Sequence, residues 1–103
     1  MDASVANIVI PYTQIRAFCE QQHIRKLALF GSVLRSDFRP DSDVDVLVEY
    51  EPDARIGLLE MAGQEIELGR VIARKVDLRT AEDLSRYFRQ QVLDEALTIY
   101  ERA

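Results

Sequence analysis

Cysteine and histidine are almost absent from this chain. Cys19 is its single cysteine and His23 its single histidine. One cysteine excludes an internal disulfide, which fits a reducing compartment. Its place beside Phe18 in an apolar helical stripe indicates a small core residue rather than a nucleophile. A single histidine, with no cysteine or second histidine nearby, argues against a zinc site.

Long apolar segments, targeting signals and linkers are also missing. No apolar stretch approaches the roughly 20 residues that a membrane-spanning helix needs, and no basic segment followed by an apolar one marks a secretory signal. We therefore expect a soluble, cytoplasmic protein with no membrane partner. Without a linker or an internal repeat, the 103 residues are predicted to form one domain, 1–103.

Basic residues are fewer than acidic ones. Thirteen Lys and Arg against 18 Asp and Glu give a formal net charge of −5. This balance disfavours direct nucleic-acid binding, because phosphate contacts need clustered Lys and Arg. Four bases do lie close together in the sequence, and the simplest interpretation is a solvated face; they are Arg70, Arg74, Lys75 and Arg79.

Hydrophobic periodicity predicts helices in three parts of the chain. Residues 11–22 have apolar side chains on one face, and residues 56–70 have an apolar stripe made of Leu58, Leu59, Ala62 and Ile66. From Thr80, which with Asp83 forms a weaker version of a capping box, apolar residues follow helical spacing to the C-terminus. We therefore expect the chain to end in a helix.

Short strands are predicted between these helices. The segments 26–30, 43–50 and 75–79 are apolar or alternate apolar and polar residues. The expected fold is therefore α/β (α+β), with a small mixed β-sheet and helices packed on one face.

Two aspartates stand at the start of the second predicted strand. Asp43 and Asp45 flank Val44, and alternate strand residues point to the same face, so both carboxylates are expected on the side opposite the valines. Two carboxylates this close repel each other. A divalent cation removes that repulsion, and Mg²⁺ takes oxygen ligands and shares its shell with substrate phosphates.

The same aspartates allow two other interpretations. A calcium loop starting at Asp41 fails, because Val46 stands where the loop needs glycine and Pro52 where it needs glutamate. A solvated acidic turn leading into an edge strand stays open on the aspartates alone.

A Gly-Ser pair follows the first predicted strand. Gly31 allows a tight turn and a close approach to a ligand, and a helix start after it would offer free N–H groups to phosphate. The Ser32 hydroxyl adds a donor. An ordinary strand-to-helix turn is the alternative. The chain has no Walker-type P-loop sequence, so the pairs together predict a different kind of nucleoside triphosphate site.

Gly31-Ser32, ten residues, and Asp43-Val44-Asp45 together resemble the G-S-x10-D-x-D signature of the polymerase-β-like nucleotidyltransferase superfamily. The chain is most similar to its minimal members, the MNT-domain proteins encoded beside HEPN-domain partners in prokaryotes. The similarity covers nearly the whole chain, through the segments LFGS, RPDSDVDVLVE, RKVDL and IYERA. It implies the palm-like nucleotidyltransferase fold.

The resemblance also implies roles for two further positions. A third carboxylate of the family matches Asp77, and a frequent family arginine matches Arg35. The chain departs from the family at Leu34 and Ser36, where a smaller residue and a glycine are common. These departures concern the loop after Ser32 and not the expected metal ligands.

The activity that the resemblance implies is Mg²⁺-dependent transfer of AMP from ATP to a hydroxyl group. Asp43, Asp45 and Asp77 would hold two Mg²⁺ ions, while Gly31 and Ser32, with Arg35, would bind the triphosphate. The implied acceptor is a tyrosine of a partner HEPN toxin. The chain would then be its antitoxin, in a possible hetero-oligomer.

Two alternative functions stay open at this point. The chain could be a non-catalytic module that neutralises a HEPN RNase by forming a complex with it. The second alternative is transfer to a small molecule, which is disfavoured because the family's enzymes of that kind carry an additional acceptor domain.

Overall fold

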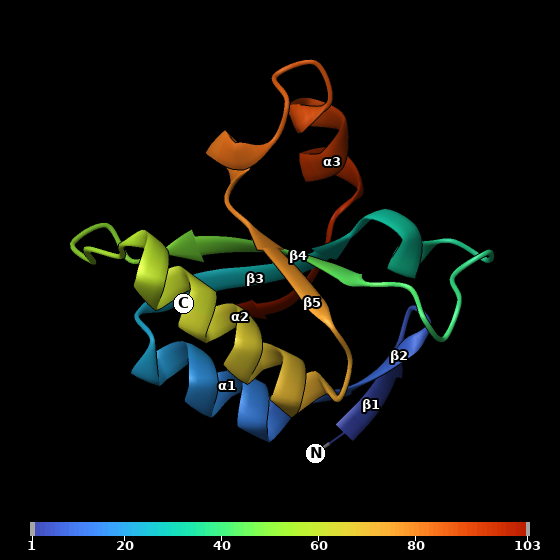
Figure 1. Ribbon diagram of the computed structural model, residues 1–103, viewed down its shortest axis with the longest axis horizontal. Coiled ribbons are helices and arrows are strands. Elements are labelled where there is room, and N and C mark those ends of the chain that lie inside the picture. Colours follow the sequence, from blue (N-terminus) through green and yellow to red (C-terminus); the bar gives the residue numbers. More distant parts are fainter. Residues whose placement is uncertain (1, 103) are drawn as a thin grey trace.

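A four-stranded mixed sheet forms the centre of the molecule (Figure 1). The computed structural model describes residues 2–102, so the two ends of the predicted domain, residues 1 and 103, lie outside the described residues. The strand order is β5-β4-β3-β6, and β4 and β5 are parallel while the other pairs are antiparallel. The bounds are Ile24–Phe30 for β3, Val44–Tyr50 for β4, Val76–Arg79 for β5 and Leu97–Glu101 for β6.

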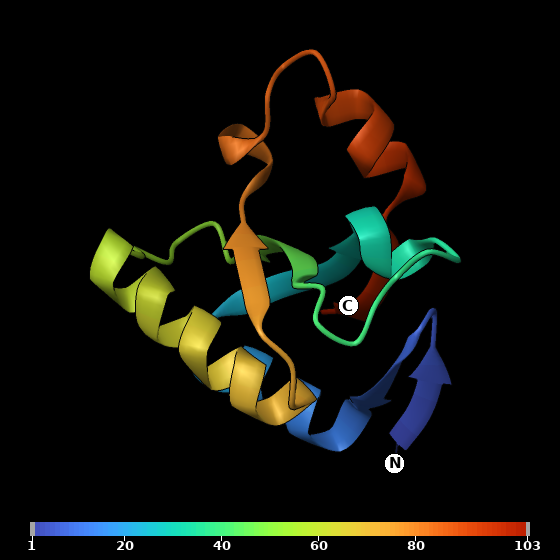
Figure 2. The same ribbon diagram turned by 45° about the vertical axis from the view of Figure 1, so that its right-hand side comes forward.

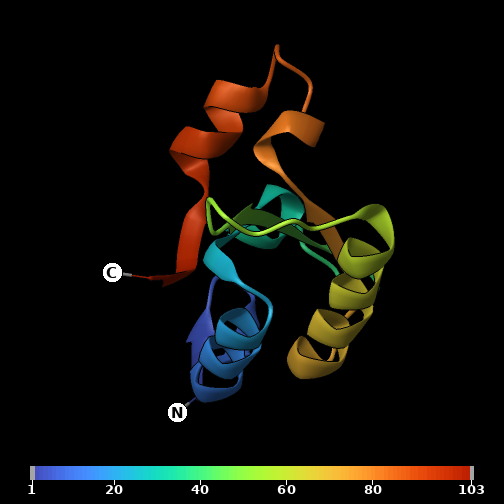
Figure 3. The same cartoon turned by 90° about the vertical axis from the view of Figure 1, so that its left-hand side faces the viewer.

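Helices α1 (Tyr12–Gln21) and α2 (Leu58–Ile72) pack on one face of this sheet, as Figure 3 shows. On the opposite side lies the segment 80–96, here called the arm, which contains the 3-10 turn η2 (Ala81–Asp83) and the short helix α3 (Arg89–Glu95). The expected sheet with helices on one face is therefore confirmed for α1 and α2. We call the other side the open face.

Strand alternation decides which side chains reach each face. Val44, Val46 and Val48 of β4 are buried on the helix side, where they meet apolar residues of the neighbouring strands and of both helices. Asp45 and Leu47 alternate with these valines and project to the open face. The predicted alternation of this strand is confirmed.

An N-terminal hairpin was not predicted from the sequence. Strands β1 (Asp2–Val5) and β2 (Ile8–Pro11) pair antiparallel through a two-residue turn, in which Ala6 has a left-handed φ of 54°. Figure 2 shows this hairpin beside the loop that follows β3. Ile8 and Ile10 are buried and extend the core.

The predicted C-terminal helix is wrong. Helix α3 ends at Glu95, and the last segment is strand β6, which pairs antiparallel with β3. Ile99 of this strand is buried in the core. The helical spacing of the apolar residues is overridden because β3 has a free edge there, and Thr98, Ile99 and Tyr100 have side chains that favour strands.

The apolar stripe expected on the second long helix exists but does not face the core. Leu58, Leu59 and Ile66 are 88%, 89% and 60% exposed, whereas Gln64 and Leu68 on the opposite side are buried. A stripe at helical spacing normally marks the core side. Here the core side includes a buried glutamine, which accepts a hydrogen bond from the Tyr50 hydroxyl at 2.5 Å.

Within residues 2–102, no helix combines the length and the apolar character required to cross a membrane.

Candidate active site

Asp45 and Asp77 lie side by side on neighbouring strands. Each is the second residue of its strand, and the parallel register of β4 and β5 pairs the two directly. Both are half-buried and project to the open face, because the residues before and after each of them face the core. The structure therefore brings the predicted third carboxylate next to Asp45.

The surroundings of Asp45 disfavour its charged form. Burial raises the pKa of its carboxyl group, and the negative charges of Asp77 and Asp43 raise it further. Arg79 and Arg35 lower it and do not cancel these effects. A half-buried carboxylate that repels two others is the electrostatic setting that a bound cation would relieve.

Asp43 differs from the other two carboxylates because it lies outside the strand. Strand β4 begins at Val44, so Asp43 belongs to the preceding loop and is exposed. Within the described part of the chain, no group of three or more His, Cys, Asp or Glu side chains is gathered closely enough to hold a metal ion. The three aspartates share one edge of the sheet but do not form a closed cluster.

Position 31 requires a glycine because the Asp45 side chain lies against its backbone. Gly31 has φ +76°, and a Cβ placed on it would overlap Oδ2 of Asp45 and lie 3.2 Å from its Cγ. Only a glycine tolerates both the left-handed backbone and this close approach. The Gly-Ser turn and the Asp-x-Asp pair, which are separated in the sequence, therefore meet in space as predicted.

The loop after Gly31 is a 3-10 turn, η1 (Gly31–Leu34), in which Ser32 is half-buried. Asn7 of the N-terminal hairpin fixes it, because its side-chain amide donates to the carbonyls of Val33 and Arg35, both at 2.7 Å. Sequence reasoning missed this role of Asn7, since nothing in the sequence indicates that the hairpin turn reaches this loop.

Side chains of the same loop divide between core and solvent. Leu34, one of the departures from the family pattern, packs against the core, while Ser36 is exposed. The Arg35 side chain is also exposed, 3.8 Å from Asp37. The positive charge of Arg35 lowers the pKa of Asp45.

Arg79 is a second residue that the sequence did not assign to the site. Its guanidinium binds both oxygens of Asp77, with Nε–Oδ1 and Nη2–Oδ2 distances of 3.1 and 3.2 Å. The predicted solvated cluster of bases is therefore divided: Arg70 is exposed near Glu67, whereas Arg79 neutralises one carboxylate of the site. Asp77 would have to exchange this partner to bind a cation.

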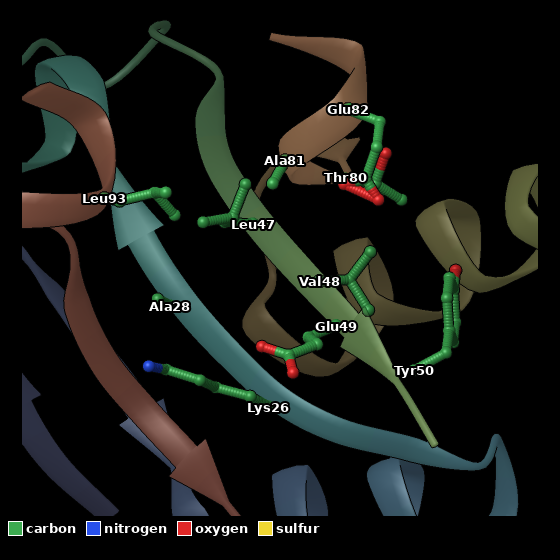
Figure 4. A pocket seen from close by; sticks show the side chains of 10 residues that line it. All are labelled: Lys26, Ala28, Leu47, Val48, Glu49, Tyr50, Thr80, Ala81, Glu82 and Leu93. Carbon is green, nitrogen blue, oxygen red and sulfur yellow. The ribbon is translucent and has the colours of Figure 1, made fainter. Parts of the chain in front are cut away.

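A hollow of about 440 Å³ lies on the open face, between the sheet and the arm. Figure 4 shows Leu47 of β4 and Leu93 of α3 pointing towards each other, with Lys26 and Glu49 further along the strands. Leu47 follows Asp45 on the same face, so the hollow begins beside the carboxylates.

A smaller hollow of about 230 Å³ borders the Gly-Ser turn. Phe30, Gly31 and Arg35 line one side, and Phe88 and Gln91 of the arm line the other. The arm therefore contributes walls to both hollows.

The donors at this edge fit a hard divalent cation. Carboxylate oxygens are the ligands that Mg²⁺ prefers, and Mg²⁺ usually takes one or two of them together with substrate phosphates. The mutual repulsion around Asp45 and the glycine that leaves room beside its carboxylate agree with such a ligand.

The sequence of this chain is similar to those of known proteins. Residues 12–99 match the model of the nucleotidyltransferase domain family. The protein adenylyltransferase MntA of Thermococcus cleftensis is 31% identical over 80 residues, which is 78% of this chain and 79% of that protein. A Methanocaldococcus jannaschii protein, provisionally named a protein adenylyltransferase, is 28% identical over 76 residues, covering 74% of this chain and 80% of that one.

Several solved structures have a similar fold. One provisionally described as a minimal nucleotidyltransferase has 31% identity and a TM-score of 0.68 over 84% of this chain and 86% of that one. A toxin–antitoxin with AMP-PNP superposes with a TM-score of 0.70 at 18% identity, covering 90% and 75% of the two chains. The tri-AMPylated Shewanella oneidensis HEPN toxin in complex with MNT antitoxin gives 0.62 at 18% identity, covering 88% and 70%. With a matching family model over most of its length, this chain belongs to the nucleotidyltransferase domain family.

Proposed function

We propose that this protein transfers AMP from ATP to a hydroxyl group of a partner HEPN toxin, and that it acts as the antitoxin of that partner. One observation carries the chemistry: Asp45, paired in register with Asp77, lies directly against the Gly31 turn. This places a carboxylate pair beside the glycine turn that follows β3. The relatives named protein adenylyltransferase and the toxin–antitoxin neighbours support the choice of acceptor.

The carboxylates would hold the metal. Asp43 and Asp45, with Asp77, would bind two Mg²⁺ ions, which when bound neutralise charge that develops on the phosphates. Asp77 would also accept a hydrogen bond from the acceptor hydroxyl and lower the cost of its deprotonation. Arg79, which binds Asp77 in the free protein, would move away from it or turn to the phosphates.

The turn after β3 would hold the donor nucleotide. Backbone N–H groups beyond Gly31 and the Ser32 hydroxyl would donate to the β- and γ-phosphates, and Arg35 would add positive charge at the exposed edge. In the transfer, the acceptor oxygen forms a bond to the α-phosphorus, and the bond from that phosphorus to the bridging oxygen breaks. Pyrophosphate leaves with the electron pair, and the hydroxyl proton is released to solvent.

The test is to incubate the protein with its HEPN partner and Mg-ATP, and to measure AMP addition by intact mass. Asp45→Asn removes a charge at the centre of the site and is expected to reduce the rate at least about 100-fold. Asp41→Asn is the matched control, because Asp41 is an exposed aspartate of the same loop; it should keep the wild-type rate.

Peptide mapping of the modified partner identifies the acceptor, which we expect to be a tyrosine. Unchanged modification and neutralisation by Asp45→Asn would contradict the catalytic proposal. A stable complex that neutralises the toxin without any AMP addition would instead favour the binding module.

A further inference from the structure

The outer side of α2 is an uncovered apolar surface. Leu58, Leu59 and Ile66 are among the most exposed large hydrophobic side chains of the described residues. They recur at helical spacing with the exposed Ala62 and Gly63, and so form one continuous face; we call these five residues the α2 stripe. Figure 2 shows α2 along the flank of the molecule, with its outer side turned away from the sheet. Isolated exposed leucines are common, but a contiguous patch marks an interaction surface.

Gly63 is an independent indication of a close neighbour. A glycine inside a helix is less stable than alanine there, and a contact usually explains it. A Cβ on Gly63 would meet nothing within 4 Å, so no contact inside the described chain requires the missing side chain. The backbone of a neighbouring molecule that packs closely against this helix would require a glycine there.

The two ends of the stripe differ in charge and shape. Glu60 lies in the first turn of α2 and Arg70 in its last turn. Beside Ile66 and Gly69 there is a hollow of about 340 Å³, with mostly apolar walls. The stripe therefore has an acidic end with protruding leucines and a basic end with a recess.

We infer that the α2 stripe pairs with the same stripe of a second copy, with the two helices antiparallel around Ala62 and Gly63. A two-fold interface must be self-complementary, so that residue i contacts residue j in both directions. Leu59 and Ile66 are equally far from the midpoint between Ala62 and Gly63, so each would lie opposite the other in the partner copy.

The same antiparallel register brings the acidic end of each stripe to the basic end of the other. Leu58 of one copy falls at the level of residue 67 of the other, on the side of the recess beside Ile66 and Gly69. Glu60 and Arg70 then lie on the same side of the helix pair, about 8 Å apart along the axis at 1.5 Å per residue. An arginine side chain, which leans towards the helix N-terminus, covers that distance.

A second copy fits this surface better than the acceptor protein. The acceptor must reach Asp45 and Asp77 on the open face, whereas the α2 stripe lies beyond the helix layer on the other side of the sheet (Figure 3). Pairing through α2 leaves both open faces free. The dimer therefore does not depend on the proposed activity.

The oligomeric state of the purified chain tests the inference. Sedimentation should show a dimer at micromolar concentrations, and Ile66→Glu should raise the dissociation constant at least about tenfold, because it places a carboxylate in an apolar contact. Val9→Glu is the control, since Val9 of β2 is 54% exposed and is not part of the α2 stripe, and this variant should stay dimeric. Gly63→Ala should weaken the dimer without lowering the stability of the monomer, which a purely structural role of Gly63 would not produce.

A cross-link fixes the register. The native Cys19 is buried, and burial raises the pKa of its thiol to about 12, so it should stay silent. Ala62→Cys should form an intermolecular disulfide on oxidation with diamide, and Asp53→Cys should not. A monomer at all accessible concentrations, a dimer unaffected by Ile66→Glu, or a HEPN partner that loses binding through Ile66→Glu would overturn the inference.

Discussion

A single glycine joins the two halves of the candidate site. Gly31 has a left-handed φ and lies against the Asp45 carboxylate. The conformation of the turn and the position of the aspartate therefore depend on each other. Asn7 then holds the rest of the turn through two backbone carbonyls. The position of the proposed phosphate-binding loop thus depends on two residues that carry no charge.

Gly31→Ala should damage both fold and site. A non-glycine residue in the left-handed region costs about 1–3 kcal/mol, and the added Cβ must displace the Asp45 side chain. We expect a loss of stability in that range by chemical denaturation, together with weaker AMP-PNP binding by calorimetry. Gly57→Ala is the matched change at a negative φ of −87° and should cost less and leave binding intact. Equal effects of the two variants would show that Gly31 has no special role.

At the scale of elements, the arm depends on one arginine. Arg89 of α3 donates to the carbonyls of Ala81 and Leu84 at 2.8 and 3.0 Å, and more weakly to that of Glu82 at 3.4 Å. It therefore ties the helix to η2. Because the arm lines both hollows of the open face, this one side chain helps to shape the space available to the reactants.

Arg89→Ala should loosen the arm and spare the sheet. Removing these hydrogen bonds is expected to cost about 1–3 kcal/mol and to speed amide hydrogen exchange in residues 83–89, with the strands unchanged. Arg86→Ala is the control. Within the part of the chain that the structure describes, the exposed Arg86 forms its hydrogen bond and its ring contact with the neighbouring Tyr87 and does not join separate segments of the arm. Uniform loss of protection across β3 and β4 would instead mean that Arg89 supports the whole fold.

Local patterns predicted the elements that have one clear partner. Strand β4 was predicted because Val44, Val46 and Val48 alternate with polar residues, and the same alternation put Asp45 on the opposite face. The place of Asp77 beside Asp45 was implied by the family resemblance. The C-terminal strand was missed because its apolar spacing also suits a helix. The free edge of β3 decided between the two, and that edge is a property of the assembled sheet.

Other features depend on contacts that no local pattern contains. The Asp77–Arg79 pair and the anchoring of Val33 by Asn7 each need the finished fold. The outward direction of the α2 stripe is a further case, because the spacing of Leu59 and Ile66 identifies an apolar face but not what covers it. A core face and an interface have the same periodicity.

On the scale of the whole molecule, the sheet separates two surfaces. The carboxylates and both hollows lie on the open face, and the α2 stripe lies outside the helix layer on the other side. Among the described residues, no side chain belongs both to the α2 stripe and to the carboxylates or hollows of the open face. Substitutions on one surface should therefore act independently of those on the other, as is usual for distant sites without shared partners.

This separation predicts additive effects in a double variant. Ile66→Glu should weaken the dimer and change AMP-PNP affinity by no more than about twofold, which is the usual limit of non-additivity for distant sites. Asp45→Asn should do the reverse, and the double variant should show the product of the two changes, measured by sedimentation and calorimetry. If Ile66→Glu also weakens nucleotide binding well beyond that limit, the two faces are coupled through α2, whose Glu65 accepts a hydrogen bond from the backbone N–H of Leu78, the residue after Asp77, at 2.8 Å. That contact would then be the path to test next, because it is where the outer helix meets the strand that carries the third carboxylate.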